Sequence, residues 1–301
     1  MLVNFLALII LARCQKMNIQ IKAMTMNLAL VDLMTGVAIL LDSFLSPVLP
    51  ESICRPLTYL YCIGVIVSFA TITGLLLDRF LAIYYPYRYQ KVHLHEKQCS
   101  VIVISGTWIV GIILSVLNYV DGFLIYKTQR TALCVSYVMT GKIGLAIVTM
   151  VFCFLLVFNM FLYLLMFIKI YRLSRSAYPK NTMKGNLYSN QARVLIKLSA
   201  IIGSFMLLYT PLIVINVIVV VVDNNMAETL LTWQSFAGFL ILLNSFLNPF
   251  LYVWRFTECR YTFLSMVCCC WKSRKEKYEN LKKKFFVSFL QAENSYTPYR
   301  K

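Results

Sequence analysis

Residues 142–168 read KIGLAIVTMVFCFLLVFNMFLYLLMFI, and Lys142 is the one charged side chain in this run. A helix needs roughly 20 apolar residues to cross a hydrocarbon core about 30 Å thick, so this run is long enough for one crossing. Further runs with few charges lie outward from it, at 1–12, 24–47, 57–78, 99–120, 194–222 and 230–253. They predict an all-α membrane protein with a seven-helix bundle. Because the first run is short and begins at Met1, we expect a truncated first helix or a wrongly assigned start.

The composition of the 301 residues supports this interpretation. AVILMFWYC make up 60% and DEKR 14%, with a mean hydropathy of +0.72, whereas soluble domains have roughly 45–50% and about 25%. The net charge of +17 raises the question of nucleic acid, but such proteins gather their cations on a soluble face. Here apolar runs separate the cations, so we expect a lipid bilayer and no nucleic acid. The ten Cys residues lack metal-site spacing.

The basic residues are distributed unevenly between the connections. Most follow the first, third, fifth and seventh runs, and the other connections hold only Arg55, Lys127, Arg130 and Lys142. The positive-inside rule then places the amino end outside and the carboxyl end in the cytoplasm. We expect a multi-pass protein of the plasma membrane.

The carboxyl end suggests two further features. Residues 254–267 (WRFTECRYTFLSMV) alternate apolar and charged side chains, which predicts a short amphipathic helix at the interface. We therefore divide the chain into a membrane domain, 1–267, and a cytoplasmic tail, 268–301. Cys268, Cys269 and Cys270 stand where a juxtamembrane cluster can be palmitoylated, the alternative being three free thiols.

One acidic residue lies in the middle of the second predicted helix. An ionisable group inside a membrane is costly and usually faces a partner or water. Oxygen-bearing side chains at similar depth are offered by Ser68, Asn244, Ser245 and Asn248. Together with Asp32 they either hold a hard monovalent cation or form a purely structural polar knot.

Two motifs lie near the predicted cytoplasmic ends of helices. Asp78-Arg79-Phe80 ends the third run, where a charged pair is either functional or an ordinary snorkelling pair. Asn248-Pro249-Phe250-Leu251-Tyr252 lies in the seventh run, and its proline frees a backbone carbonyl. Pro211 does the same in the sixth run and predicts a kink that can act as a hinge.

Two cysteines lie on the predicted outer side. Cys54 precedes the third run and Cys134 lies between the fourth and fifth. They can pair in the oxidising compartment.

These residues together resemble the rhodopsin-like (class A) G-protein-coupled receptors, over nearly the whole chain. Asn4 lies 28 residues before Asp32, and Cys54 lies 25 before Arg79, as in the family. Asp78-Arg79-Phe80 resembles its D/E-R-Y motif, and residues 248–252 form a complete NPxxY. Trp108 and Pro211 match its helix-four tryptophan and helix-six proline.

The chain also departs from the family pattern. Tyr209 stands where the helix-six tryptophan is usual, Leu155 replaces the helix-five proline, and Gln191 stands where many members carry an acid that pairs with the helix-three arginine. The last change weakens the expected inactive-state lock. The missing proline and the DRFLAIYYPYRY segment look most like the adenosine/melanocortin-type branch.

The resemblance implies a mechanism and partners. An extracellular ligand binds the outward half, helix six moves about Pro211, and the cytoplasmic side admits a heterotrimeric G protein. Arg79 then leaves Asp78, supported by Tyr163 and Tyr252. Arrestin and a receptor kinase are further expected partners, and no cofactor is expected apart from sodium as a modulator.

The ligand is not identified by the sequence. Tyr61 stands where aminergic receptors carry their aspartate, and Asn216 resembles the purine-binding asparagine of adenosine receptors, whose helix-seven histidine is Leu242 here. Leu242 also stands in place of the retinal lysine of opsins. The resemblance places these side chains at the pocket: Asp42, Tyr61, Cys62, Val65, Tyr209, Leu212, Asn216, Gln234 and Gly238.

The sequence gives little support to two other classes of function, a transporter or channel and an enzyme. A transporter or channel would use Asp32 and Asp42 as relay groups, and should show repeats or matching broken helices, which the sequence lacks. Catalysis has no support, because His93 and His95 lie in a loop without a nucleophile constellation.

Overall fold

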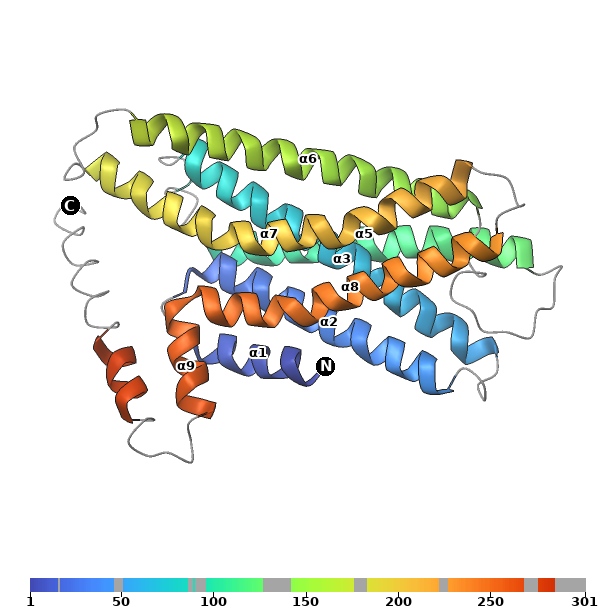
Figure 1. Cartoon of the computed structure of the whole chain (residues 1–301), viewed down its shortest axis with the longest axis horizontal. Helices are drawn as coiled ribbons and strands as arrows, with labels where there is room; N and C mark the ends of the chain where they lie inside the picture. The colour runs from blue at the N-terminus through green and yellow to red at the C-terminus, as the bar shows by residue number, and fades with distance from the viewer. Residues whose placement is uncertain are drawn as a thin grey trace.

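The computed structural model of the chain describes residues 1–15, 17–45, 51–85, 89, 96–126, 142–175, 183–221, 227–267 and 276–284. Within these residues the secondary structure is helical and no strand occurs. The named helices are α1 (Leu2–Arg13), α2 (Ile19–Leu45), α3 (Glu51–Tyr84), α5 (Glu96–Tyr126), α6 (Lys142–Arg175), α7 (Met183–Val221), α8 (Ala227–Arg255) and α9 (Thr257–Val267). The helices from α1 to α8 run lengthwise in one bundle, and α9 turns across its end (Figure 1).

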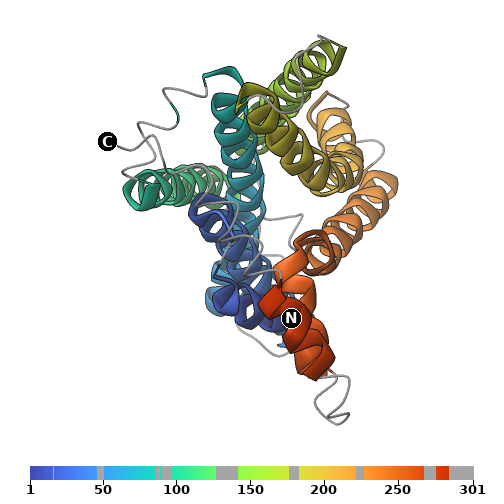
Figure 2. The same ribbon diagram turned by 90° about the vertical axis from the view of Figure 1, so that its left-hand side faces the viewer.

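Helix α3 is the central element of the bundle. It contacts α2, α5, α6 and α7, and the end-on view shows it running between α5 and the pair formed by α6 and α7 (Figure 2). Helix α1 packs against α2, α8 and α9, and α8 also contacts α7 and α2. Side chains on different faces of α3 therefore contact four other helices, and polar groups along α3 can link these helices by hydrogen bonds.

The outer surface of the bundle is apolar. Helix α6 exposes a stripe of large apolar side chains at spacings of three and four residues: Met150, Phe154, Val157, Phe161, Leu164 and Ile168. Such a stripe lies on one face of a helix, and it points away from the core. Exposed apolar faces of this extent are expected in contact with lipid and not with water.

Five helices contain a stretch that is long and apolar enough to cross a membrane. These stretches are Ile19–Leu41, Tyr59–Tyr84, Gln98–Leu117, Ile143–Arg172 and Ile202–Val221. Two shorter apolar stretches complete the set within the described residues, Leu2–Arg13 in α1 and Phe236–Leu251 in α8. The predicted all-α, seven-helix fold is confirmed.

The interior combines an aromatic cluster with buried polar groups. Phe69 of α3 lies 5.0 Å from Phe152 of α6 and 4.9 Å from Phe205 of α7, measured between ring centroids. Tyr209 stacks on Phe205 at 4.0 Å and meets the Phe69 ring edge-on at 5.5 Å. This cluster joins α3, α6 and α7 at the core of the bundle.

Two glycines allow helices to approach α3 closely. A Cβ on Gly64 would lie 2.0 Å from the Thr35 hydroxyl oxygen of α2, and one on Gly111 would lie 2.5 Å from a methyl carbon of Val67. Both distances are too short for non-bonded atoms. The contacts of α3 with α2 and α5 therefore depend on the absence of a side chain at these positions.

Several helix boundaries differ from the predicted runs. Helix α2 begins at Ile19 instead of residue 24, because the Asn18 side-chain oxygen accepts hydrogen bonds from the backbone N–H groups of Gln20 (3.0 Å) and Ile21 (3.2 Å). This is an N-cap, which apolarity alone does not reveal. Helix α7 begins at Met183, well before residue 194, because a helix continues beyond its apolar part.

The predicted interfacial helix, 254–267, is also shorter than expected. Helix α8 continues to Arg255, the chain bends at Phe256, and α9 spans Thr257–Val267. The sequence alternation began inside the last turn of α8, where apolar and charged side chains also occur. The correction is one of boundary, since a separate helix follows the bundle as predicted.

Candidate functional site

A buried ion pair occupies the C-terminal end of α3. The Arg79 Nε donates a hydrogen bond to Asp78 Oδ2 at 2.8 Å, and Nη2 of the same guanidinium contacts the same oxygen. Arg79 is 3% exposed and Asp78 is 8% exposed. Removing one partner of a buried pair leaves an uncompensated charge, so each residue constrains the other.

Tyr89 completes this site, and sequence reasoning missed it. Its hydroxyl accepts a hydrogen bond from Arg79 Nη2 at 3.1 Å and lies 2.9 Å from Asp78 Oδ1. Its oxygen also lies 2.5 Å from Gln20 Oε1 of α2. Because a phenol has one hydrogen, it donates to Asp78 or to Gln20 at any moment. The sequence signal for Tyr89 was the tyrosine-rich segment after Arg79, but its spacing does not show which tyrosine contacts the ion pair.

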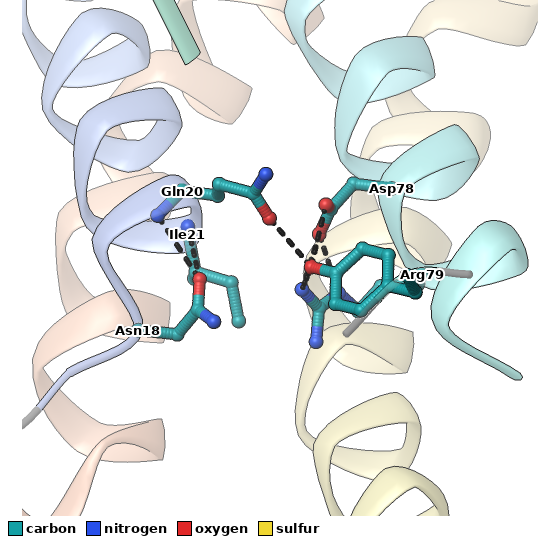
Figure 3. Close-up of polar contacts among 6 residues, drawn as sticks. Asn18, Gln20, Ile21, Asp78 and Arg79 are labelled. Atoms are coloured by element: carbon teal, nitrogen blue, oxygen red, sulfur yellow. Dashed lines mark hydrogen bonds and ion pairs between the residues drawn. The ribbon is translucent and has the colours of Figure 1, made fainter. Parts of the chain in front are cut away.

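Electrostatics keep the Tyr89 hydroxyl protonated. Burial raises the pKa of Tyr89 well above its usual value, although the nearby Arg79 charge works in the opposite direction. The group is therefore a neutral donor at physiological pH. Figure 3 shows Gln20 reaching from α2 toward Asp78 and Arg79, with Asn18 capping the start of α2. The network thus joins α2 and α3 at one end of the bundle.

A cavity of about 590 Å³ lies beside this network. Its lining is largely apolar, with the polar groups of the network at one side. The lining residues are Gln20, Met24, Gly74, Leu77, Asp78, Leu81, Tyr85, Tyr89, Cys99, Ser100 and Val103.

A second polar site surrounds Asp32, inside the bundle. Asp32 is 2% exposed. Ser245 Oγ donates to its Oδ1 at 2.8 Å, and Asn248 Nδ2 donates to its Oδ2 at 2.9 Å. Ser68 of α3 also hydrogen-bonds to the carboxylate. The structure therefore brings Ser68 of α3 and Ser245 and Asn248 of α8 together around this acid of α2.

Unsatisfied polar atoms lie on the same stretch of α8 as Ser245 and Asn248. Both side-chain polar atoms of Asn244 and the Oδ1 of Asn248 are buried and have no hydrogen-bond partner among the described residues. Asn4 Nδ2 donates to the Ser245 carbonyl at 3.1 Å, which ties α1 to the group. Buried polar atoms are usually satisfied by protein, water or an ion, so this site has spare capacity for a ligand.

Polar bridges fasten the other helices to α3. Trp108 Nε1 of α5 donates to Asn27 Oδ1 at 2.9 Å, and Asn27 Nδ2 donates to the Thr71 hydroxyl at 2.9 Å. On the α6 side, Asn159 Nδ2 donates to the Thr73 hydroxyl at 3.0 Å. Trp108 was identified in the sequence only by resemblance, and these contacts give its structural role.

The remaining motif residues occupy varied positions. Phe80 stacks on Tyr84 at 4.4 Å between ring centroids, and Tyr163 packs partly buried against the core. Pro211 lies inside α7 and Pro249 inside α8.

The pocket candidates are partly described. Val65, Tyr209 and Asn216 are buried, whereas Tyr61, Cys62, Leu212 and Gly238 are partly exposed. Other predicted positions lie outside the side chains that the structure describes, and nothing tests them: Asp42, Cys54, Cys134, Gln191, Gln234, Tyr252, Cys268, Cys269 and Cys270.

The bundle, its apolar outer surface and its two buried charged sites define a multi-pass helical membrane protein. Comparison with known proteins extends this conclusion. Residues 3–252 match the family of 7 transmembrane receptors (rhodopsin family). The chain belongs to this family, which is a class of receptors.

The curated relatives include melanocortin receptors. Melanocortin receptor 5 of Mus musculus is 24% identical over 212 residues, which cover 69% of this chain and 58% of that receptor. Melanocortin receptor 3 of Rattus norvegicus is 21% identical over 212 residues, covering 69% and 60%. Melanocortin receptor 4 of Danio rerio is 22% identical over 214 residues, covering 70% and 59%. The resemblance to the melanocortin-like branch is confirmed, and the match spans about three fifths of these relatives' length.

Proposed function

We propose that the protein binds an extracellular ligand and activates heterotrimeric G proteins by movement of α7. The observation that carries this proposal is the buried Asp78–Arg79 pair, held by Tyr89 at one end of the central helix. A buried guanidinium beside a carboxylate is a group that can exist in two positions, paired inside or turned outward to a partner. In the proposed orientation this end of the bundle lies in the cytoplasm, where the G protein binds.

Helix α7 is the element that moves in this proposal. Pro211 interrupts its hydrogen bonding, and the neighbouring Thr210 hydroxyl donates to the Met206 carbonyl at 2.6 Å, a contact that often bends helices. Tyr209, two residues before Pro211, is buried in the aromatic cluster with Phe69 and Phe205. A ligand that displaces Tyr209 therefore acts on α3 and α7 together.

The ligand acts through the state it prefers. A ligand shifts a two-state equilibrium only by its differential affinity for the two states. The pocket candidates Leu212 and Asn216 follow Tyr209 on α7, and Val65 of α3 belongs to the same buried apolar cluster as Tyr209. Because the relatives are melanocortin receptors by name, melanocortin peptides are the first ligand class to test.

The site around Asp32 fits a sodium ion as an allosteric modulator. The unsatisfied oxygens of Asn244 and Asn248, with the carboxylate of Asp32 and the hydroxyls of Ser68 and Ser245, form an all-oxygen donor set. A bound sodium ion would supply positive charge to Asp32 and hold α2, α3 and α8 together. The ion would therefore favour the inactive arrangement.

Further features complete the proposal. The amino end lies outside the plasma membrane and the carboxyl end in the cytoplasm, Cys54 and Cys134 form a disulfide, and one or more of Cys268, Cys269 and Cys270 is palmitoylated. Arrestin and a receptor kinase are proposed partners of the tail. Membership in a family of receptors argues against the transporter alternative.

A G-protein dissociation assay in intact cells tests the proposal. Cells expressing the chain are exposed to a melanocortin peptide and to a wider peptide panel, and the separation of each Gα subunit from Gβγ is measured. A saturable, ligand-dependent signal that is absent in Arg79→Ala at equal surface expression supports coupling. Specific binding of a ligand without dissociation of any Gα subunit would leave a receptor fold but contradict G-protein coupling.

A further inference from the structure

Two thiols meet at the junction of α1 and α9. Cys14 directly follows α1, and Cys259 lies in the first turn of α9. Their Sγ atoms are 2.7 Å apart, and both residues are 0% exposed. A disulfide bond is about 2.0 Å long, so only a small approach separates these sulfur atoms from a covalent bond.

The backbone on each side of the pair is held in place. Gln15 N donates to Glu258 Oε1 at 2.7 Å, which fastens the residue after Cys14 to the residue before Cys259. Lys22 Nζ donates to the Cys14 carbonyl at 2.6 Å and to the Ala12 carbonyl at 3.1 Å. The two thiols are therefore held together by their surroundings and do not meet by chance at a mobile end.

The two sulfur atoms differ in reactivity. The hydrogen bond between the two thiols lowers the pKa of Cys14, and the Lys282 charge acts in the same direction, although burial and Glu258 oppose them. The same hydrogen bond raises the pKa of Cys259. Cys14 is thus the more acidic thiol of the pair, and a thiolate is the form that attacks oxidants and disulfides.

We propose that Cys14 and Cys259 are a redox site that closes to a disulfide under hydroperoxide and reopens under thiol reductants. The Cys14 thiolate attacks hydrogen peroxide, whose O–O bond breaks to leave a sulfenic acid and hydroxide. The Cys259 thiol then attacks the sulfenic sulfur, an S–S bond forms and water leaves. Two thiols and one peroxide thus give one disulfide and two waters, and two equivalents of glutathione reverse the change.

The proposed orientation of the chain sets the resting state of this site. With the carboxyl end in the cytoplasm, the junction faces a reducing compartment, where disulfides are usually transient and regulatory. Closure would join the end of α1 covalently to α9 and limit their relative movement. The site is independent of the ligand and of G-protein coupling, and it is separate from Cys268, Cys269 and Cys270.

Differential thiol labelling of the full chain in cell membranes tests this inference. Membranes receive graded hydrogen peroxide, free thiols are blocked with N-ethylmaleimide, and disulfides are then reduced and labelled with the heavy isotope form of the reagent. We expect Cys14 and Cys259 to gain heavy label together, at lower peroxide than Cys99, and a peptide linking both in the unreduced digest. Dithiothreitol removes the link, whereas hydroxylamine, which cleaves thioester-linked acyl groups, does not.

Variants and opposite outcomes complete the test. Cys14→Ser abolishes heavy labelling of Cys259, while Cys99→Ser, which alters a partly buried thiol of α5, leaves the pair unchanged. If both thiols stay free at peroxide levels that oxidise Cys99, the proposal is wrong. A link already complete without peroxide would also overturn it, because the bond would then be structural. The decisive measurement is the labelling of Cys14 and Cys259 in the unmutated chain, so misfolding of a variant does not obscure the result.

Discussion

Arg79 is held by its neighbours within the same end of the bundle. Its guanidinium contacts Asp78, one residue earlier, and the Tyr89 hydroxyl. Gln191 lies in α7, which corresponds to helix six of the family, at the place where many members carry an acidic partner for the arginine. Its side chain is neutral and cannot form an ion pair. The free energy of releasing Arg79 is therefore set mainly by Asp78 and Tyr89, and small changes in either should shift the balance between states.

Tyr89→Phe should raise ligand-free signalling. The change removes one hydroxyl that contacts Arg79, Asp78 and Gln20, while the ring stays. A hydrogen bond contributes about 0.5–1.5 kcal/mol, which corresponds to a rise of roughly 2- to 12-fold in the active fraction near balance. Basal G-protein activation at equal surface expression measures it. Tyr85→Phe, whose residue is half exposed, is the control and should change nothing.

Asp32→Asn should reduce the sodium sensitivity of ligand binding. The variant keeps the size of the side chain and some hydrogen bonds with Ser245 and Asn248 but removes the charge that a cation needs. Agonist affinity measured over a range of sodium concentrations, with potassium as the ionic-strength control, gives the result. If the variant responds to sodium as the unmutated chain does, Asp32 and its partners form only a structural polar knot and do not bind the ion.

The packing of the helices depends on small residues at the crossings of α3. Gly64→Ala should destabilise the protein, because the added Cβ would lie 2.0 Å from the Thr35 hydroxyl oxygen. Overpacking of this kind costs about 1–3 kcal/mol. Gly203→Ala is the matched control, since a Cβ there meets no atom within 4 Å and alanine favours helix. The melting temperature of the detergent-solubilised receptor compares them; equal values would mean that α2 and α3 are not this close.

Apolar runs predicted the helices well but not their ends. A run ends where lipid contact ends, whereas a helix ends where its backbone hydrogen bonds are capped or interrupted. The Asn18 cap at the start of α2 and the bend at Phe256 after α8 are both of this second kind. Sequence patterns of single runs therefore locate the membrane-crossing part of each helix better than its full length.

At the scale of the whole molecule, the polar site could be predicted in part. Asp32, Ser68, Ser245 and Asn248 were grouped because a buried acid needs partners at similar depth, and the structure brings them together. Tyr89 could not be grouped in this way, because it lies beyond the apolar run and beyond the end of α3 at Tyr84, where the helical period of that run no longer says which side chains share a face. The same limit applies to Cys14 and Cys259, which lie far apart in the sequence.

The side of the molecule that we propose to be extracellular carries a further prediction. Cys54 and Cys134 should form a disulfide that ties the segment between α5 and α6 to the start of α3. Loss of such a bond commonly costs about 2–4 kcal/mol, so Cys54→Ser and Cys134→Ser should both lower surface expression. Peptide mapping of surface-expressed receptor without reduction identifies the link, and finding both thiols free would refute it. Cys153→Ser, in the middle of α6, serves as the control.

The central claim is that Arg79 at the end of α3 is the group through which this receptor activates a G protein. Nucleotide exchange on purified heterotrimeric G protein, measured with membranes at equal receptor density and without ligand, tests it most directly. We predict exchange above the level of mock membranes for the unmutated chain, a lower rate for Gln191→Glu, which restores a charged partner, and no exchange above background for Arg79→Ala. Two results would contradict the account. One is the same exchange rate in all three proteins. The other is a rate for the unmutated chain that equals that of mock membranes and does not change in Gln191→Glu.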